Sequence, residues 1–231
     1  MRIFAHRGAS AQAPENTLAA FELALTQGAW WLELDVQCLE DELVVLHDDT
    51  LDRTTDGEGP LAALTLAQLR ALDAGQGERV PLLRELLERL AGRAALNVEL
   101  KGPGTGAPAA RLLAQQVAQG RWAADAILLS AFSATELEAA RAVAPGLPRA
   151  LLSARADAGA VAAAAALGAV ALHVPVRAVD AAAVGRVHGA GLALNVFTVN
   201  DAQSFARLRA LGVDGLFTDY PGQALRHWRH A

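Results

Sequence analysis

Two acidic residues, Glu33 and Asp35, stand two positions apart in the stretch "WLELDVQCLEDELVVLHDD", residues 31–49. In a β-strand this spacing sends both carboxylates to one face, roughly 7 Å apart along the strand. An isolated acid pair on a strand usually belongs to a solvated face. Here the intervening residues are apolar, which indicates a strand covered on both sides, and buried acids need a partner or a metal. The pair is therefore a candidate metal site.

A second pair, Glu99 and Lys101 in "LNVELK", repeats this geometry, because both side chains leave one face and Leu100 faces the other way. Lys101 is the only lysine in a chain whose other basic side chains are arginines. A lysine in such a composition indicates a role for a compact ammonium group.

His6 and His47 add groups that can transfer protons near neutral pH, since free imidazole titrates at about 6.5. Three carboxylates supply hard oxygen ligands that suit Mg²⁺ or Ca²⁺, and the absence of a cysteine cluster argues against structural zinc. A bound cation implies an anionic substrate such as a phosphate, which Arg7 and Lys101 could also hold. His173 could reach the same place, and its role is left open.

Strand-like apolar runs alternate with alanine-rich helical segments along the whole chain, which is typical of parallel β/α architecture. The predicted strands are 2–6, 30–37, 95–101, 126–131, 149–153, 168–174, 192–198 and 214–218. The predicted helices are 16–27, 82–91, 107–119, 134–143, 157–167, 178–189, 201–210 and 222–229. Eight strands favour an α/β TIM (β/α)8 barrel. An open doubly wound sheet is disfavoured, because no glycine-rich phosphate turn follows the first strand.

A barrel would bring these side chains together, because catalytic groups in β/α barrels come from the C-terminal ends of the strands. The seventh strand ends near residues 195–200 and the eighth ends in Thr218 and Asp219. The first helix is expected to use Asn16 as its N-cap. We expect a single domain, 1–231, with a small insertion at about 48–80 after the second strand.

Composition excludes several partners. A net charge of −5 leaves no basic surface for nucleic acid. No apolar run approaches the about 20 residues that span a bilayer, and no basic amphipathic helix would give stable membrane association. The single cysteine, Cys38, is expected to be a small buried thiol, and it fits a reducing, cytoplasmic location. Whether the chain forms a homodimer stays open.

The motifs together resemble the glycerophosphodiester phosphodiesterase family, in its cytosolic bacterial branch. The matching segments run in the family's order from position 5 to 221: "AHRGAS", "PENTLAAF", "ELDV", "VVLHDDTLDRTTDGEGP", "LNVELK", "NVFTVN" and "FTDYP". The resemblance implies a β/α barrel and metal-dependent hydrolysis of glycerophosphodiesters, such as glycerophosphocholine and glycerophosphoethanolamine, to sn-glycerol 3-phosphate and an alcohol.

The resemblance also implies roles by position. It gives the metal ligands as Glu33, Asp35 and Glu99, the acid/base pair as His6 and His47, and the phosphate contacts as Arg7 and Lys101. Glu15, in "PEN", matches a recurrent position for which we expect a supporting hydrogen bond.

The chain departs from the family pattern at two aromatic positions. Phe197 stands where the family often has tryptophan, and Phe132 lies in "SAFS" rather than the usual Ser-Phe pair. Both are candidate pocket walls for the glycerol or the alcohol.

Two mechanisms and two other functions stay open. The glycerol 2-hydroxyl could attack phosphorus to give a cyclic phosphate, or water could attack directly. The alternative functions are a phospholipase-like enzyme that acts on lysophospholipids or phosphoinositides, and a barrel that binds metal and phosphodiester without catalysis.

Overall fold

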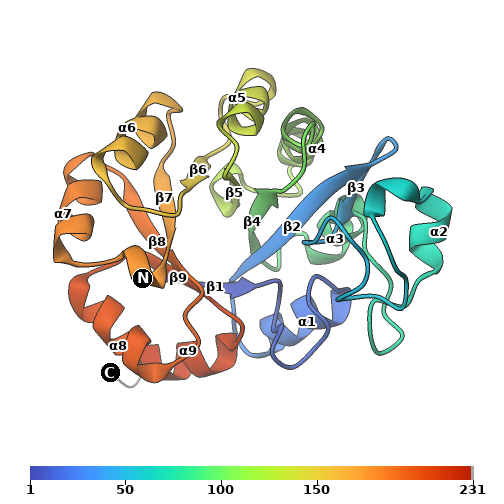
Figure 1. The fold of residues 1–231 in the computed structure, drawn as a ribbon, viewed down its shortest axis with the longest axis horizontal. Helices are drawn as coiled ribbons and strands as arrows, with labels where there is room; N and C mark the ends of the chain where they lie inside the picture. The colour runs from blue at the N-terminus through green and yellow to red at the C-terminus, as the bar shows by residue number, and fades with distance from the viewer. Residues whose placement is uncertain (230–231) are drawn as a thin grey trace.

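The computed structural model describes residues 1–229, and its centre is a closed barrel of eight parallel strands (Figure 1). The barrel strands are β1 (Arg2–His6), β2 (Trp31–Leu39), β4 (Ala95–Leu100), β5 (Ile127–Ala131), β6 (Arg149–Leu152), β7 (Ala171–Pro175), β8 (Ala193–Phe197) and β9 (Gly215–Thr218). The barrel closes because β1 pairs with both β2 and β9. The predicted TIM barrel is confirmed, and each strand lies within three residues of its predicted bounds.

A ring of helices covers the outside of the barrel (Figure 1). Its members are α1 (Leu18–Thr26), α3 (Leu83–Leu90), α4 (Gly106–Ala118), α5 (Ala134–Val143), α6 (Ala158–Ala166), α7 (Ala181–Gly189), α8 (Ala202–Leu211) and α9 (Pro221–Arg229). Five of them are capped by a side chain that accepts a backbone N–H of the first turn, which satisfies an otherwise unpaired donor: Thr17, Ser133, Asp157, Asp180 and Asp201. No helix within residues 1–229 is long and apolar enough to cross a membrane.

One connection leaves the ring, between β2 and α3. It holds β3 (Glu42–Val45), antiparallel to β2, then the short 3-10 helix η1 (Leu61–Ala63) and α2 (Leu66–Ala71). We call the segment from 46 to 82 the excursion; it extends to the right in Figure 1, beyond α1. The excursion has its own apolar cluster, which includes Leu51, Leu69 and Val80. Because this cluster also contains Leu39 of β2 and Val44 of β3, the excursion packs against the barrel.

Aromatic rings fill part of the barrel interior. Phe4 stacks on Phe217 with 4.4 Å between ring centroids, and His173 lies 5.0 Å from Phe217. His173 is completely buried, its Nε2 lies 3.0 Å from Asn195 Nδ2, and burial lowers the pKa of His173 to about 3. His173 is therefore a neutral interior residue, which answers the question that the sequence left open.

The predicted N-cap is wrong by one residue. Thr17 caps α1, with its hydroxyl accepting the Ala20 N–H, whereas Asn16 has a left-handed backbone (φ 59°). Asparagine is one of the few non-glycine residues that adopt this region readily. The Asn16 side chain turns inward and donates to Asp35 instead.

The predicted burial of Cys38 is also wrong. Cys38 is a free, exposed thiol whose Sγ lies 3.4 Å from the Gly104 carbonyl oxygen. Val36, on the same face of β2, is fully buried, but Cys38 lies near the C-terminal end of the strand, where this face is no longer covered.

Candidate active site

Three carboxylates meet at one end of the barrel. Asp35 on β2 pairs in register with Glu99 on β4, and Glu33 lies two residues before Asp35 on the same face. One oxygen from each of the three lies within 4.8 Å of the others. Both β2 acids are almost completely buried, at 2% exposure for Glu33 and 1% for Asp35. The structure thus brings together the three predicted metal ligands.

These acids lie in conditions that disfavour three negative charges. Burial raises the pKa of Glu33 well above its ordinary value, and Asp35 and Glu99 raise it further. Burial and Asp35 likewise raise the pKa of Glu99. A cation among them would relieve this repulsion.

The donor set fits a hard divalent cation. Asp35 Oδ1 is buried and has no hydrogen-bond partner among the described residues. Buried carboxylate oxygens require a partner, and Mg²⁺ and Ca²⁺ bind carboxylate oxygens preferentially. The residues present therefore suit a divalent cation, and Glu33, Asp35 and Glu99 are its candidate ligands.

Arg7 borders the carboxylates from the turn after β1. Its backbone N–H donates to Glu33 Oε2 at 2.9 Å, and its guanidinium pairs with Glu15 Oε1 at 2.8 Å and Asp35 Oδ2 at 3.2 Å. Burial lowers the pKa of Arg7, but Asp35, Glu33 and Glu15 raise it more strongly. Glu15 therefore makes a hydrogen bond of the kind expected from the sequence, and this bond holds the Arg7 guanidinium in place.

The tight turn that carries Arg7 depends on Gly8. Gly8 has φ 86°, and a Cβ there would lie 2.6 Å from the carbonyl carbon of Ala20 in α1. Only glycine tolerates both the left-handed backbone and this approach. Close packing of the turn on α1 therefore places His6 and Arg7 at the end of the barrel that carries the three carboxylates.

His6, at the end of β1, pairs with Asp219 just after β9. His6 Nδ1 lies 2.6 Å from Asp219 Oδ1, and the same carboxylate accepts from Ser10 Oγ at 3.1 Å and Asn200 Nδ2 at 2.5 Å. Burial raises the pKa of Asp219, but the hydrogen bonds from His6, Asn200 and Ser10 outweigh it and lower the pKa overall. Asp219 is therefore an ionised partner that orients the imidazole.

His47, in the excursion, contacts a carboxylate in the same way as His6 does. Its Nδ1 lies 2.5 Å from Asp48 Oδ1, and Lys101 Nζ lies 3.1 Å from its Nε2. Burial is the main reason that the pKa of His47 is lowered. A neutral His47 that donates from Nδ1 to Asp48 presents Nε2 as an acceptor to Lys101.

Gln37 anchors the turn that carries this pair. Its amide nitrogen donates to the carbonyl oxygens of Leu46, His47 and Asp48, at 3.2, 3.3 and 2.7 Å. Lys101 links the pair to the carboxylates, because its Nζ also lies 3.2 Å from Glu99 Oε1.

The two aromatic positions form a pair. The rings of Phe132 and Phe197 meet edge to face, with 6.2 Å between centroids, and Phe132 is 53% exposed. An exposed phenylalanine after β5 and its partner at the end of β8 offer an apolar surface at this end of the barrel. Their role as pocket walls stays a prediction.

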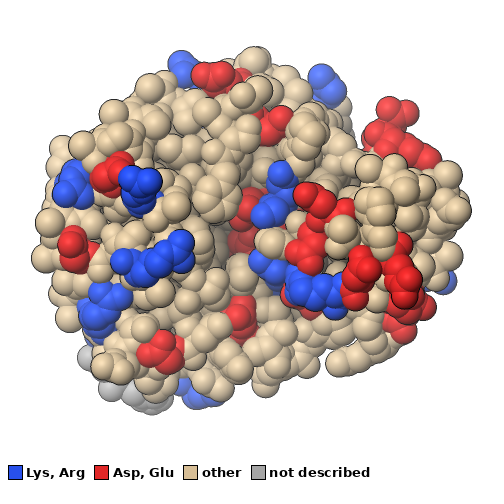
Figure 2. Space-filling view, viewed as in Figure 1, with Lys and Arg blue, Asp and Glu red and all other residues tan. Residues whose placement is uncertain are grey.

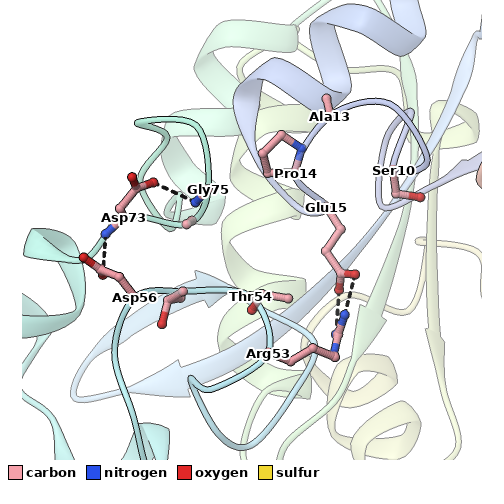
Figure 3. A pocket seen from close by; sticks show the side chains of 11 residues that line it. Ser10, Ala13, Pro14, Glu15, Arg53, Thr54, Asp56, Asp73 and Gly75 are labelled. Carbon is pink, nitrogen blue, oxygen red and sulfur yellow. Dashed lines mark hydrogen bonds and ion pairs between the residues drawn. The ribbon is translucent and has the colours of Figure 1, made fainter.

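Charged side chains gather at the centre of this face and over the excursion (Figure 2). A cavity of about 270 Å³ is lined by His6, Arg7, Asp219 and Tyr220, among others. A larger one, about 490 Å³, lies between the loop before α1 and the excursion, and Figure 3 shows Glu15 and Arg53 in its wall. The smaller cavity is the one that directly adjoins a candidate acid/base residue.

Four residues of the site escaped the sequence analysis as site residues. The sequence predicts a helix cap at Asn16 and a strand end at Asp219, and it gives no signal for Arg53 or Gln37. The "DRTT" and "FTDYP" motifs contain two of them, but only the folded chain shows which atoms they contact.

The chain matches a known family. The model of the glycerophosphoryl diester phosphodiesterase family matches residues 6–223. The chain is 36% identical to the YhdW protein of Bacillus subtilis over 242 residues, which cover 100% of this chain and 99% of the relative. It is 34% identical to a glycerophosphodiester phosphodiesterase of Caldanaerobacter subterraneus over 236 residues, which cover 95% and 94%.

Solved structures agree with these relatives. An Oleispira antarctica phosphodiesterase in complex with the product sn-glycerol-3-phosphate aligns with a TM-score of 0.91 at 33% identity, covering 99% of this chain and 97% of that one. A glycerophosphodiester phosphodiesterase from Agrobacterium tumefaciens aligns with a TM-score of 0.82 at 30% identity, covering 98% and 99%.

Proposed function

This chain belongs to the glycerophosphoryl diester phosphodiesterase family, and we propose from that premise that it hydrolyses glycerophosphodiesters to sn-glycerol 3-phosphate and an alcohol with a divalent cation and two histidines. It is an enzyme, a glycerophosphodiester phosphodiesterase. The cation, the histidine roles and the individual substrates are the parts that we propose.

The observation that supports this proposal best is the position of both His–Asp pairs beside one carboxylate cluster. His6 pairs in register with Glu33 of β2, and His47 contacts Lys101, which also contacts Glu99, so each imidazole borders the cluster. Phosphodiester hydrolysis needs charge compensation and two proton transfers at one place.

Glu33, Asp35 and Glu99 would hold Mg²⁺ or Ca²⁺. When bound, the ion would offset negative charge on the phosphoryl oxygens. Arg7 and Lys101 would add positive charge at the same oxygens, Arg7 through a guanidinium already fixed by Glu15.

The histidines would divide the proton transfers. We assign the first base to His47, because its lowered pKa leaves the imidazole neutral at neutral pH. His6, oriented by Asp219, would then protonate the departing alcohol. The substrates would be water-soluble phosphodiesters, including glycerophosphocholine and glycerophosphoethanolamine. The free thiol of Cys38 fits a reducing compartment such as the cytoplasm.

Two nucleophiles satisfy this arrangement, the glycerol 2-hydroxyl and water. With the 2-hydroxyl as nucleophile, His47 removes its proton, a cyclic phosphate forms as the alcohol leaves, and water then opens the ring. A substrate without the 2-hydroxyl separates the routes, because normal turnover of that compound excludes the cyclic one.

The first test measures release of glycerol 3-phosphate from glycerophosphocholine, using a coupled dehydrogenase. Activity should vanish with EDTA, return with Mg²⁺ or Ca²⁺, and be absent from His6→Ala. If folded protein hydrolyses none of several glycerophosphodiesters with any metal, the proposal is wrong. Lysophospholipid hydrolysis or binding without catalysis would then be tested next.

A further inference from the structure

Arg53, in the excursion, contacts two different carboxylates although its side chain is half exposed. Its side chain is 48% exposed, yet all three guanidinium nitrogens bind carboxylates. Nε donates to Asp48 Oδ2 at 2.6 Å, Nη1 to Glu15 Oε2 at 2.6 Å and Nη2 to Glu15 Oε1 at 2.8 Å. Figure 3 shows the two parallel bonds to Glu15, in the wall of the larger cavity.

Each of the two acids also contacts a residue of the proposed active site. Asp48 uses its other oxygen to hold His47 Nδ1. Glu15 also accepts from Arg7 Nη1, and Arg7 pairs with Asp35. A continuous series of contacts therefore connects the acid/base residue on the excursion to the turn after β1, with Arg53 at its middle.

We propose that Arg53 is a positioning residue: its guanidinium holds Asp48 and Glu15 at a fixed separation and thereby orients His47 and Arg7 toward the same phosphate. This inference rests on the proposed function of both residues. Arg53 contacts Asp48 and Glu15, so it would act on His47 and Arg7 through these two acids.

The shape of arginine explains why this residue type stands here. A planar guanidinium can give two parallel N–H bonds to one carboxylate and a third bond to another, whereas an ammonium is a point charge without a fixed fork. The hydrogen bond from Arg53 is also the main reason that the pKa of Asp48 is lowered, which keeps Asp48 a carboxylate and an acceptor for His47.

Stability alone does not account for this arrangement, since exposed ion pairs contribute little to the free energy of unfolding. A comparable pair exists elsewhere: Arg84 of α3 pairs with Glu42 at 3.2 Å with a side chain 51% exposed. Arg84 contacts neither Asp48 nor Glu15 among the described residues, so it is a matched control for the loss of an exposed arginine.

The central experiment compares Arg53→Met with Arg84→Met in the hydrolysis of glycerophosphocholine. We expect kcat of Arg53→Met to fall by about 10- to 100-fold, as when outer partners of site residues are removed, with little change in KM. Arg84→Met should keep wild-type kcat, and both variants should keep similar melting temperatures. A kcat within twofold of wild type for Arg53→Met would overturn the proposal.

Two further variants separate positioning from structural support. Arg53→Lys should recover only part of the lost kcat, because it restores charge without the fork; full recovery would contradict the geometric role. In a His47→Ala background, Arg53→Met should cost less than in the wild type, since the residue through which it acts is gone. An equal cost in both backgrounds would show that Arg53 does not act through His47.

A spectroscopic readout keeps this test independent of the proposed activity. In ¹⁵N-labelled protein at about pH 8, where histidines are neutral, His47 should be the Nδ1–H tautomer, and Arg53→Met should give a mixture of tautomers. The signal is assigned from its absence in His47→Ala. An unchanged tautomer in Arg53→Met would overturn the inference, whereas an inactive wild type with the expected tautomer shift would contradict only the proposed function.

Discussion

The two His–Asp pairs of the site are chemically alike but are built in opposite ways. His6 and Asp219 are 213 positions apart in sequence, and the pairing of β1 with β9 brings them together. His47 and Asp48 are neighbours in sequence, and the excursion carries both. Ser10 and Asn200 support the first pair, and Arg53 supports the second.

The two pairs are therefore held in position by different kinds of contact. The first pair joins two neighbouring barrel strands, and both Ser10 and Asn200 donate to its carboxylate. The second pair depends on Gln37, which anchors its backbone, and on a guanidinium that is half exposed. We therefore expect kcat to fall when a member of either pair is substituted. For the His47–Asp48 pair, we expect it to fall also when the supporting Arg53 is substituted.

The largest expected effect tests whether both pairs are needed. His6→Gln and His47→Gln should each lower kcat by about 10²- to 10⁴-fold, the usual contribution of a general acid or base. Steady-state assays of both variants with one glycerophosphodiester check this. A variant that keeps kcat within tenfold of wild type would assign both proton transfers to the other pair.

The next effect compares the two acids. Asp219→Asn should lower kcat/KM about 100-fold and Asp48→Asn about tenfold. Asp219 is the common acceptor for His6, Ser10 and Asn200, whereas His47 keeps its contact with Lys101 when Asp48 is changed. A larger loss in Asp48→Asn would reverse the proposed order of rigidity.

The contribution of Asp219 to stability should depend on pH. Because the folded-state pKa of Asp219 is lowered, its contribution is present above the unfolded value of about 4 and is lost as pH falls through the folded value. Asp219→Asn should therefore cost about 1 kcal/mol in the free energy of unfolding at neutral pH. Urea denaturation at neutral pH and at about pH 3 measures this, and a cost that grows on acidification would contradict it.

The smallest effect concerns salt. Raising ionic strength from about 0.05 to about 0.5 M should screen the exposed contacts of Arg53. The kcat of wild type and of Arg84→Met should fall by about two- to threefold at saturating substrate, while Arg53→Met should be nearly insensitive. Equal salt responses in all three proteins would mean that the second pair does not depend on this contact.

Periodicity and turn chemistry were enough to predict the barrel, because parallel β/α units repeat the same signals along the chain. The same strand geometry predicted the acidic cluster, since Glu33 and Asp35 on one strand and Glu99 on another face inward by alternation alone. These are consequences of local patterns.

Other features depend on tertiary contacts that no local pattern encodes. Asn16 has a sequence typical of an N-cap, but its left-handed backbone aims the amide at Asp35, and the threonine after it caps the helix. Nothing in the sequence distinguishes Arg53 from a surface arginine, because its contacts with Asp48 and Glu15 form only when the excursion packs against the barrel. Asp219 becomes the partner of His6 only when the last strand pairs with the first.

The candidate site residues are unevenly distributed along the sequence. The three carboxylates, both histidines, Arg7 and Lys101 all lie within the first 101 residues, while Asp219 follows β9. Contacts across such separations close large loops and form slowly compared with local ones. A nascent chain would therefore carry the metal ligands long before β9 reaches β1. Catalytic competence would arise at barrel closure, so that the His6–Asp219 contact also reports that the barrel is complete.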